Sequence, residues 1–241
     1  MGNIYIGGYV EDADIWSGQD IIIQDGVNAG ENGRIEAMGN ISARFFENAH
    51  IISHSDIKCD YMLNTTALAY GGIYLEGKRG SVIGGDVTGV RGICIKACGS
   101  ESYSKTVLRV GVTKEISSEY AKVLMVLKDI DTQIDRFNQA LQKLDILKKA
   151  GSDKFDETLN RKLLQSKIVK TAEKAKYEEK SRNLYTLVRE SDRAVVRIDK
   201  NIYPGSRVFM GDKTYVPSTV FTHIALKKTS QGVLIRNYDS M

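Results

Sequence analysis

Residues Gly30 to Arg91 read GENGRIEAMGNISARFFENAHIISHSDIKCDYMLNTTALAYGGIYLEGKRGSVIGGDVTGVR, and this stretch decides the fold. Its residue types repeat about every 16 positions, so aligned copies place like residues in columns. The columns are Ile35, Ile51, Ala67 and Ile83; Ala37, Ser53, Ala69 and Gly85; Gly33, Ala49, Thr65 and Ser81; Ile41, Ile57 and Ile73; Ala43, Cys59 and Leu75. Apolar or small residues recur at alternate positions, which is strand period. The repeat predicts a mainly β fold, a single-stranded parallel β-helix with one coil per repeat.

One polar column accompanies the apolar ones. Asn32, Asn48 and Asn64 recur at the same spacing, and we interpret them as an internal structural ladder of amides. Each side chain needs a partner there, because a buried unpaired amide costs about 1–3 kcal/mol. A polar binding strip is the alternative, but a ligand site does not need a fixed repeat. The opening coils repeat less regularly, and a bend at Gly84–Asp86 with inserted Gly89–Gly92 is expected to shift the register.

The period of the sequence divides the chain into three regions. We expect a β-helix over residues 1–112, an antiparallel coiled-coil hairpin over 113–192, and C-terminal strands over 193–241 that rejoin and cap the solenoid. The evidence for the first helix is two interleaved heptad series, Tyr120, Leu127, Ile134 and Leu141 with Ile116, Val123, Ile130, Phe137 and Leu144.

Gly151–Asp153 breaks the helical pattern and predicts the turn of the hairpin. Ser152 or Asp153 can cap the second helix, with acidic Asp156 and Glu157 in its first turn. The expected packing positions of that helix are Phe155, Leu159, Leu163, then the smaller Ser166, Ala172 and Ala175, then Leu184 and Leu187. The two helices are expected to form a rod that protrudes from the solenoid.

Composition narrows the function classes. The chain has 241 residues, 27% of them charged, with a net charge of +4, which does not indicate nucleic-acid binding. No apolar run is long enough to span a membrane, and Met1–Asp12 lacks the basic region and apolar core of a secretory signal, so we expect neither a membrane span nor a signal peptide. Cys59, Cys94 and Cys98 fit a reducing compartment better than a disulfide framework. We therefore expect a cytoplasmic protein.

Candidate chemical sites are weak. His50 and His54 lie near Asp56, but a metal or acid–base site needs a third convergent ligand, and Cys94 with Cys98 has the same deficiency. The basic turn Gly77–Ser81 lacks the spacing of a phosphate loop. Glu31 and Glu47 are one repeat apart and could form a carboxylate pair, although a solvated edge is the simpler interpretation. We expect no catalytic residues, no cofactor and no metal.

A cluster of lysines on the second helix is the candidate partner-binding surface. Lys167, Lys170, Lys174 and Lys176 lie near small residues, where a partner helix or an acidic protein could dock.

The order of these regions resembles the bacterial flagellar assembly protein A family (FapA). The resemblance is carried by Gly39–Ala43, Glu47–Ile51, Gly77–Gly80, Ile83–Asp86 and Tyr203–Gly205, with the inserted helices between them. It implies a right-handed coil, a cytoplasmic location and a link to flagellar assembly or cell-surface organisation. It implies no catalytic residues. Family members usually carry a further domain before the solenoid, so we expect a fragment or a short member.

Three functions remain open. The first is a non-catalytic scaffold whose hairpin binds protein partners or a second copy. The second is a carbohydrate-active or carbohydrate-binding protein, for which Phe45, Tyr61, Tyr70 and Tyr74 are candidates, although they do not obviously share a face. The third is a filament subunit like the bactofilins, against which capping strands would argue.

Overall fold

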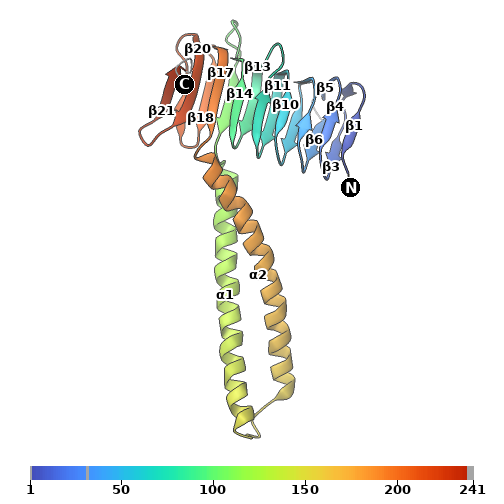
Figure 1. The fold of residues 1–241 in the computed structure, drawn as a ribbon, viewed down its shortest axis with the longest axis vertical. Helices are drawn as coiled ribbons and strands as arrows, with labels where there is room; N and C mark the ends of the chain where they lie inside the picture. Colours follow the sequence, from blue (N-terminus) through green and yellow to red (C-terminus); the bar gives the residue numbers. More distant parts are fainter. Residues whose placement is uncertain (1, 31–32, 238–241) are drawn as a thin grey trace. The chain divides into compact units, whose positions relative to one another are not determined.

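A computed structural model describes residues 2–30 and 33–237 of the chain. It is a parallel β-solenoid with a helical hairpin inserted and additional strands at the C-terminal end (Figure 1). Two compact units are present: residues 1–113 with 187–241, and residues 114–186. The predicted fold class is confirmed.

Each coil contributes strands to three parallel columns. The first column is β1 (Ile4–Ile6), β4 (Ile21–Ile23), β7 (Ile41–Ser42), β10 (Ile57–Cys59), β12 (Gly72–Leu75), β14 (Gly92–Ile95) and β17 (Val195–Ile202). The second column is β2 (Val10–Glu11), β5 (Gly26–Asn28), β8 (Phe45–Glu47), the first parts of β11 (Tyr61–Ala69) and β13 (Ser81–Gly89), and β15 (Ala97–Cys98). The third column is β3 (Ile15–Ser17), β6 (Arg34–Ala37), β9 (His50–Ser53), the second parts of β11 and β13, β16 (Thr106–Val110) and β18 (Ser206–Met210).

The interior is a pile of aliphatic side chains in register. The deepest column is Ile21, Ile41, Ile57, Ile73 and Ile93, each with 0% of its surface exposed. Full burial of one such side chain contributes about 1.5–3 kcal/mol. β-branched residues suit this position because their restricted rotamers pack well on a pleated surface. The predicted Ile41, Ile57 and Ile73 column is therefore confirmed.

The predicted column through Ile83 is only partly correct. Ile35 pairs with Ile51 and Ile51 with Ala67, but Ala67 then pairs with Val87. Ile83 instead pairs with Leu63 and is only partly buried. The columns beside it shift in the same way.

The cause of the shift is the turn Gly77–Gly80, which lengthens this coil by four residues. Ser81 therefore pairs with Tyr61, and Gly85 pairs with Thr65 rather than with Ala69. The insertion therefore precedes the Gly84–Asp86 bend, whereas the sequence pattern predicted a shift after this bend. Asp60 stabilises the turn, because its Oδ1 accepts hydrogen bonds from the backbone amides of Arg79 at 2.8 Å and Gly80 at 3.1 Å.

The bend between the second and third columns uses left-handed backbone. Asn48 and Asn64 both have φ of 48°, and Gly84 has φ of 71° at the equivalent place one coil on. Asn and Gly tolerate this conformation better than other residues do. Asn48 and Asn64 are exposed. The prediction that this asparagine column is internal is therefore wrong for these two, although Nδ2 of Asn48 donates to Oδ1 of Asn28 at 3.1 Å, and Asn32 lies outside the described residues.

An axial ladder exists at a different corner, between the third and first columns. Each side-chain Oδ1 there accepts a hydrogen bond from a backbone amide one coil further on. Asn3 accepts from the amide of Asp20 at 3.1 Å, Asp20 from that of Asn40 at 2.6 Å, Asn40 from that of Asp56 at 3.2 Å, and Asp56 from that of Gly72 at 2.8 Å. These residues each precede the first isoleucine of a coil. They hold successive corners together along the solenoid axis.

The inserted hairpin consists of α1 (Lys114–Lys149) and α2 (Glu157–Ser191). Gly151, with φ of 61°, ends α1, and the amide of Ser152 donates to the carbonyl of Leu147 at 3.1 Å, as in a Schellman motif. The cap of α2 is Asp156, whose Oδ1 accepts from the amides of Thr158 at 2.8 Å and Leu159 at 3.0 Å. The predicted caps, Ser152 and Asp153, are therefore wrong by one helical turn, because Asp156 is the acidic side chain that reaches the free amides.

The last strands return to the solenoid and then reverse direction. β17 and β18 extend the first and third columns in parallel. β19 (Lys213–Tyr215), β20 (Phe221–Lys228) and β21 (Val233–Asn237) then pair antiparallel with β18, β17 and β20. The change of direction closes the parallel stacking at this end of the solenoid.

Candidate interaction surface

The predicted lysine cluster divides between the interior and the exterior of the hairpin. Lys167, Lys170 and Lys174 are partly buried, whereas Lys176 is exposed. Most of the partly or fully buried positions of α2 recur at alternating steps of three and four residues: Leu163, Lys167, Lys170, Lys174, Tyr177, Ser181, Leu184 and Val188. This spacing defines the seam that faces α1. Three lysines therefore occupy seam positions that leucine would ordinarily fill.

Ion pairs within the hairpin hold two of these lysines. The Nζ of Lys174 lies 2.7 Å from Oδ1 of Asp131 on α1 and 3.6 Å from Glu178. The hydrogen bond to Asp131 raises the pKa of Lys174, which keeps it charged. Lys170 pairs with Glu173 at 2.7 Å. The contact of Lys174 with Asp131 joins the two helices, whereas those with Glu173 and Glu178 lie within α2, and Lys176 is the most accessible of the four.

The small residues of α2 lie outside the seam. Ser166, Ala172 and Ala175 are exposed, so the expectation that they pack with the leucines of the helix is wrong. The heptads of α1 are in the expected phase, since Ile116, Val123, Ile130 and Leu144 are all buried.

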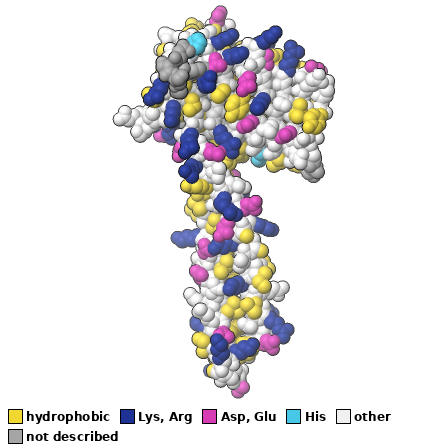
Figure 2. Space-filling view, viewed as in Figure 1, with side chains coloured by type: hydrophobic (Ala, Val, Ile, Leu, Met, Phe, Trp, Pro, Cys, Tyr) yellow, Lys and Arg dark blue, Asp and Glu magenta, His cyan; other side chains and the backbone are white. Residues whose placement is uncertain are grey.

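Large apolar side chains are also exposed on both helices. The most exposed are Met125 at 72%, Ile168 at 68%, Ile146 at 66% and Val169 at 59%. Figure 2 shows hydrophobic side chains on the hairpin interspersed with charged side chains of both signs. A mixture of apolar and charged groups on one surface is typical of interfaces that form reversibly.

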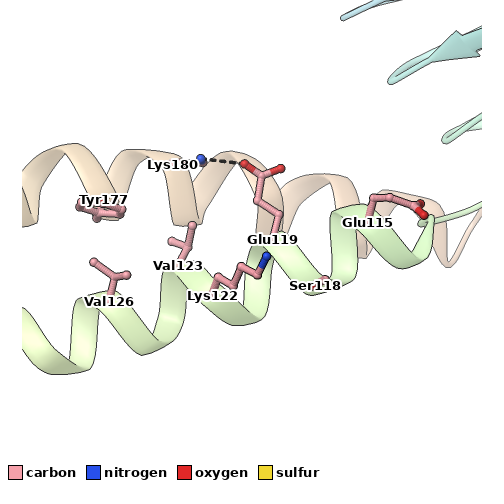
Figure 3. A pocket seen from close by; sticks show the side chains of 8 residues that line it. All are labelled: Glu115, Ser118, Glu119, Lys122, Val123, Val126, Tyr177 and Lys180. Atoms are coloured by element: carbon pink, nitrogen blue, oxygen red, sulfur yellow. Dashed lines mark ion pairs between the residues drawn. The ribbon is translucent and has the colours of Figure 1, made fainter.

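A shallow groove runs between the two helices. Its volume is about 730 Å³, and it is lined by Glu115, Ser118, Glu119, Lys122, Val123, Val126, Tyr177 and Lys180. Val123 and Val126 of α1 and Tyr177 of α2 point into the space between the helices, while the charged residues form the rim (Figure 3). The Nζ of Lys180 lies 2.7 Å from Oε1 of Glu119 across the groove. Glu119 precedes Asp131 on α1, whereas its partner Lys180 follows Lys174, the partner of Asp131, on α2. The two helices are therefore antiparallel.

The outer surface of the solenoid carries an aromatic stack. The rings of Phe45 and Tyr61 stack with centroids 5.1 Å apart and planes 10° apart, and the guanidinium of Arg79 lies 4.4 Å from the Tyr61 centroid. The Tyr61 hydroxyl donates to Glu47 at 2.7 Å. Two of the four aromatic candidates for sugar binding thus share a face, which the sequence did not indicate. Their ring faces contact each other and Arg79, whereas a sugar-binding platform needs a free face.

The other predicted polar candidates lie in separate environments. The His54 ring stacks on the Tyr70 ring with centroids 4.8 Å apart, and its Nε2 lies 3.7 Å from Oε1 of Glu36. Oδ1 of Asp56 accepts a hydrogen bond from the backbone amide of Gly72. His50 is exposed on β9, and Glu31 lies outside the described residues. Over residues 2–30 and 33–237, no three His, Cys, Asp or Glu side chains are grouped to hold a metal ion.

The three cysteines are free thiols. Burial raises the pKa of Cys98 to about 12 and also raises the pKa of Cys59. Cys94 is less buried, and burial also raises its pKa. Cys59 and Cys98 therefore act as small core residues, in agreement with the interpretation of Cys59 from the sequence.

Comparison with known protein families identifies the family of this chain. The model of the Flagellar Assembly Protein A beta solenoid domain matches residues 1–231. The chain belongs to the flagellar assembly protein A family. The comparisons with curated proteins and with solved structures found no match to the chain.

The match to this family spans the solenoid strands before the hairpin, the hairpin itself and the strands after it. In this FapA family member the hairpin enters after β16 and leaves before β17, so it occupies one corner of a coil. No helix in the described part of the chain is long and apolar enough to cross a membrane.

Proposed function

We propose that this chain is a non-catalytic cytoplasmic scaffold in flagellar assembly or cell-surface organisation, and that its helical hairpin binds protein partners or a second copy. Membership of the FapA family supports the link to flagellar assembly. The observation that carries the binding role is the hairpin surface, where Met125 and Ile168 are about 70% exposed although the seam is already occupied. Such side chains gain most from a partner that covers them.

The lysines contribute to this proposal unequally. Lys176 is exposed one heptad after Val169 on the same side of α2, so a partner that covers Val169 also contacts its ammonium group. Lys170 and Lys174 are expected to influence binding through the geometry of the helix pair, because their charges are paired within the hairpin.

The test is affinity capture from the native cell with the full chain and with a variant that lacks the hairpin. In the variant, a three-residue turn copied from His54–Asp56 replaces residues 111–195. Proteins that depend on the hairpin should be captured by the full chain and lost with the variant. A pair of exposed substitutions, Met125→Ser and Ile168→Ser, should weaken capture without unfolding the helices. Capture that survives both changes would contradict the proposal.

A further inference from the structure

One exposed side of α2 carries an ordered set of residues, which we call the outer face of α2. Its members are spaced three or four residues apart and therefore lie along one side of the helix, away from the seam: Glu157, Arg161, Leu164, Ile168, Ala172, Ala175, Glu179 and Arg182. All eight are exposed, with Leu164 at 43% and Ile168 at 68%.

The chemical order of this face is complementary to itself. From its N-terminal end it reads acid, base, large apolar, large apolar, small apolar, small apolar, acid, base. When a second copy is laid antiparallel with Leu164 opposite Ala175, Glu157 faces Arg182 and Arg161 faces Glu179. Ile168 then faces Ala172, so large side chains meet small ones. A parallel pairing in register would instead place each charge against its like.

We infer that two copies of this chain associate through the outer face of α2, antiparallel about a two-fold axis near Lys170. This inference rests on the proposed function, since it names the partner of the same hairpin. The two-fold arrangement uses each contact twice and closes on itself, so it yields a dimer and not a chain of subunits. The C-terminal ends of the two helices, each followed by β17, lie at opposite ends of the contact.

The size of the face indicates a weak, reversible dimer. Glu157 to Arg182 spans about 38 Å at 1.5 Å per residue, and a helix is about 10 Å wide. The contact then covers about 400 Å² on each copy, roughly half the standard interface of 800 Å² per partner. The four charge pairs at its ends are exposed, so added salt weakens them. The intrahelical pair of Arg161 with Glu157, at 2.9 Å, leaves both groups at the surface.

Cross-linking of single-cysteine variants tests the geometry. In the full chain with Cys94→Ser, a short bis-maleimide reagent should link Thr171→Cys to itself, because this position lies beside the axis. Leu164→Cys and Ala175→Cys should each stay unlinked alone, since like positions lie about 16 Å apart along the helix. Mixed together, they should link to each other. Ser166→Cys, exposed on the opposite side, is the control and should not link.

Sedimentation equilibrium of the full chain tests the affinity. Ile168→Ser should raise the dimer dissociation constant at least tenfold, whereas Val169→Ser, one residue away with a similarly exposed side chain, should leave it within twofold. Glu157→Arg should weaken the dimer, and Glu157→Arg combined with Arg182→Glu should restore it. Circular dichroism checks that every variant keeps its helices.

Two outcomes would overturn the inference. One is a strictly monomeric chain at all concentrations up to the millimolar range, and the other is Leu164→Cys linking efficiently to itself. If the chain is monomeric but capture from the native cell still needs the hairpin, the proposed function stands and only the dimer is refuted. If the dimer forms while capture is independent of the hairpin, the dimer stands and the hairpin has no other partner.

Discussion

At the residue scale, the corners of the solenoid are held by single acceptor side chains. Asp20, Asn40 and Asp56 occupy the same position in successive coils, and each accepts a hydrogen bond from the amide above it. A backbone amide at a tight corner has no neighbour in a strand to pair with, so a side chain must satisfy it. The short Asx side chain stands in for a backbone carbonyl.

Asp56 gives the first prediction. Asp56→Ala leaves the buried amide of Gly72 without its acceptor and should lower the free energy of unfolding by about 1–3 kcal/mol. Asp56→Asn keeps an oxygen at the same place and should cost much less. Urea unfolding of the two variants measures the difference. Equal losses in the alanine and asparagine variants would show that the hydrogen bond is not the cause.

The cysteines give a prediction about reactivity. At pH 8 a disulfide reagent should modify Cys94 in the folded chain and leave Cys59 and Cys98 intact, because a thiol reacts as its thiolate and burial raises the pKa of both core thiols. All three should react in denaturant. The rate at Cys94 should continue to increase with pH above about 8.5, the usual pKa of a free thiol, since its pKa is raised. Mass spectrometry of labelled peptides identifies the sites.

Single residues also show where the sequence could predict the fold and where it could not. The alternation around Ile35, Ile51 and Ala67 fixed three coils correctly because these coils have equal length. Ile83 was misassigned because strand alternation looks the same after a four-residue insertion, and only the hydrogen bonds of Asp60 to the turn mark its location. The corner ladder had a signal, an Asn or Asp before the first isoleucine of four successive coils, which the evenly spaced asparagine column obscured.

At the element scale, α2 is a helix with a weakly apolar seam. Lys167, Lys170 and Lys174 occupy successive seam positions, so this part of the pair has little hydrophobic attraction. Polar residues at such positions can fix the register of two helices at a cost in stability. The pair of Lys174 with Asp131 joins specific turns of α1 and α2 and so favours one register.

Lys167 gives the prediction at this scale. Lys167→Leu should raise the free energy of unfolding of the hairpin by about 1 kcal/mol, and with it the melting temperature, because it adds apolar surface to a partly buried seam position. Lys176→Leu, at an exposed position, is the matched control and should change stability little. Circular dichroism at the helical band during heating measures both. A lower melting temperature for Lys167→Leu would mean that the seam requires the charge.

The phase of α2 could not be predicted, although its existence could. The heptads of α1 contain large apolar residues throughout, so its buried face follows from the pattern. α2 has few such residues between Leu163 and Tyr177, and its alanines mimic an apolar face. The partner helix decides which side is buried, and this information is absent from the local sequence. The candidate lysines were therefore identified as a cluster, but which of them face α1 could not be predicted.

At the scale of the whole molecule, the hairpin replaces one short corner. Three residues separate the end of the third column from the first column at Ser17–Ile21, Ala37–Ile41, Ser53–Ile57 and Ala69–Ile73. At the same corner one coil later than Gly89–Ile93, residues 111–195 intervene between Val110 and Val196. The strands on both sides keep the register of the other coils.

The equivalence of these corners gives the prediction at this scale. Replacement of residues 111–195 by the turn His54–Asp56 should leave a folded solenoid, because the strands that it joins already pair in the register of the other coils. Far-ultraviolet circular dichroism should lose its helical component and keep its strand component, with a cooperative melt. A molten or aggregated product would show that the hairpin is needed to bring β17 back to β14.

The same corner also sets an order of events during folding. Val196 can stack on Ile93 only after the chain has travelled through the whole insertion and returned, and closing a flexible loop costs more entropy as the loop lengthens. Two helices that pair early bring Val110 and Val196 near each other and shorten the effective loop, so the final coil should be completed late and at a rate that depends on helix pairing. In stopped-flow refolding, the Lys167→Leu variant should therefore complete the last phase faster than the unchanged chain. Pairing of the two helices would then set the rate at which the C-terminal end of the solenoid closes.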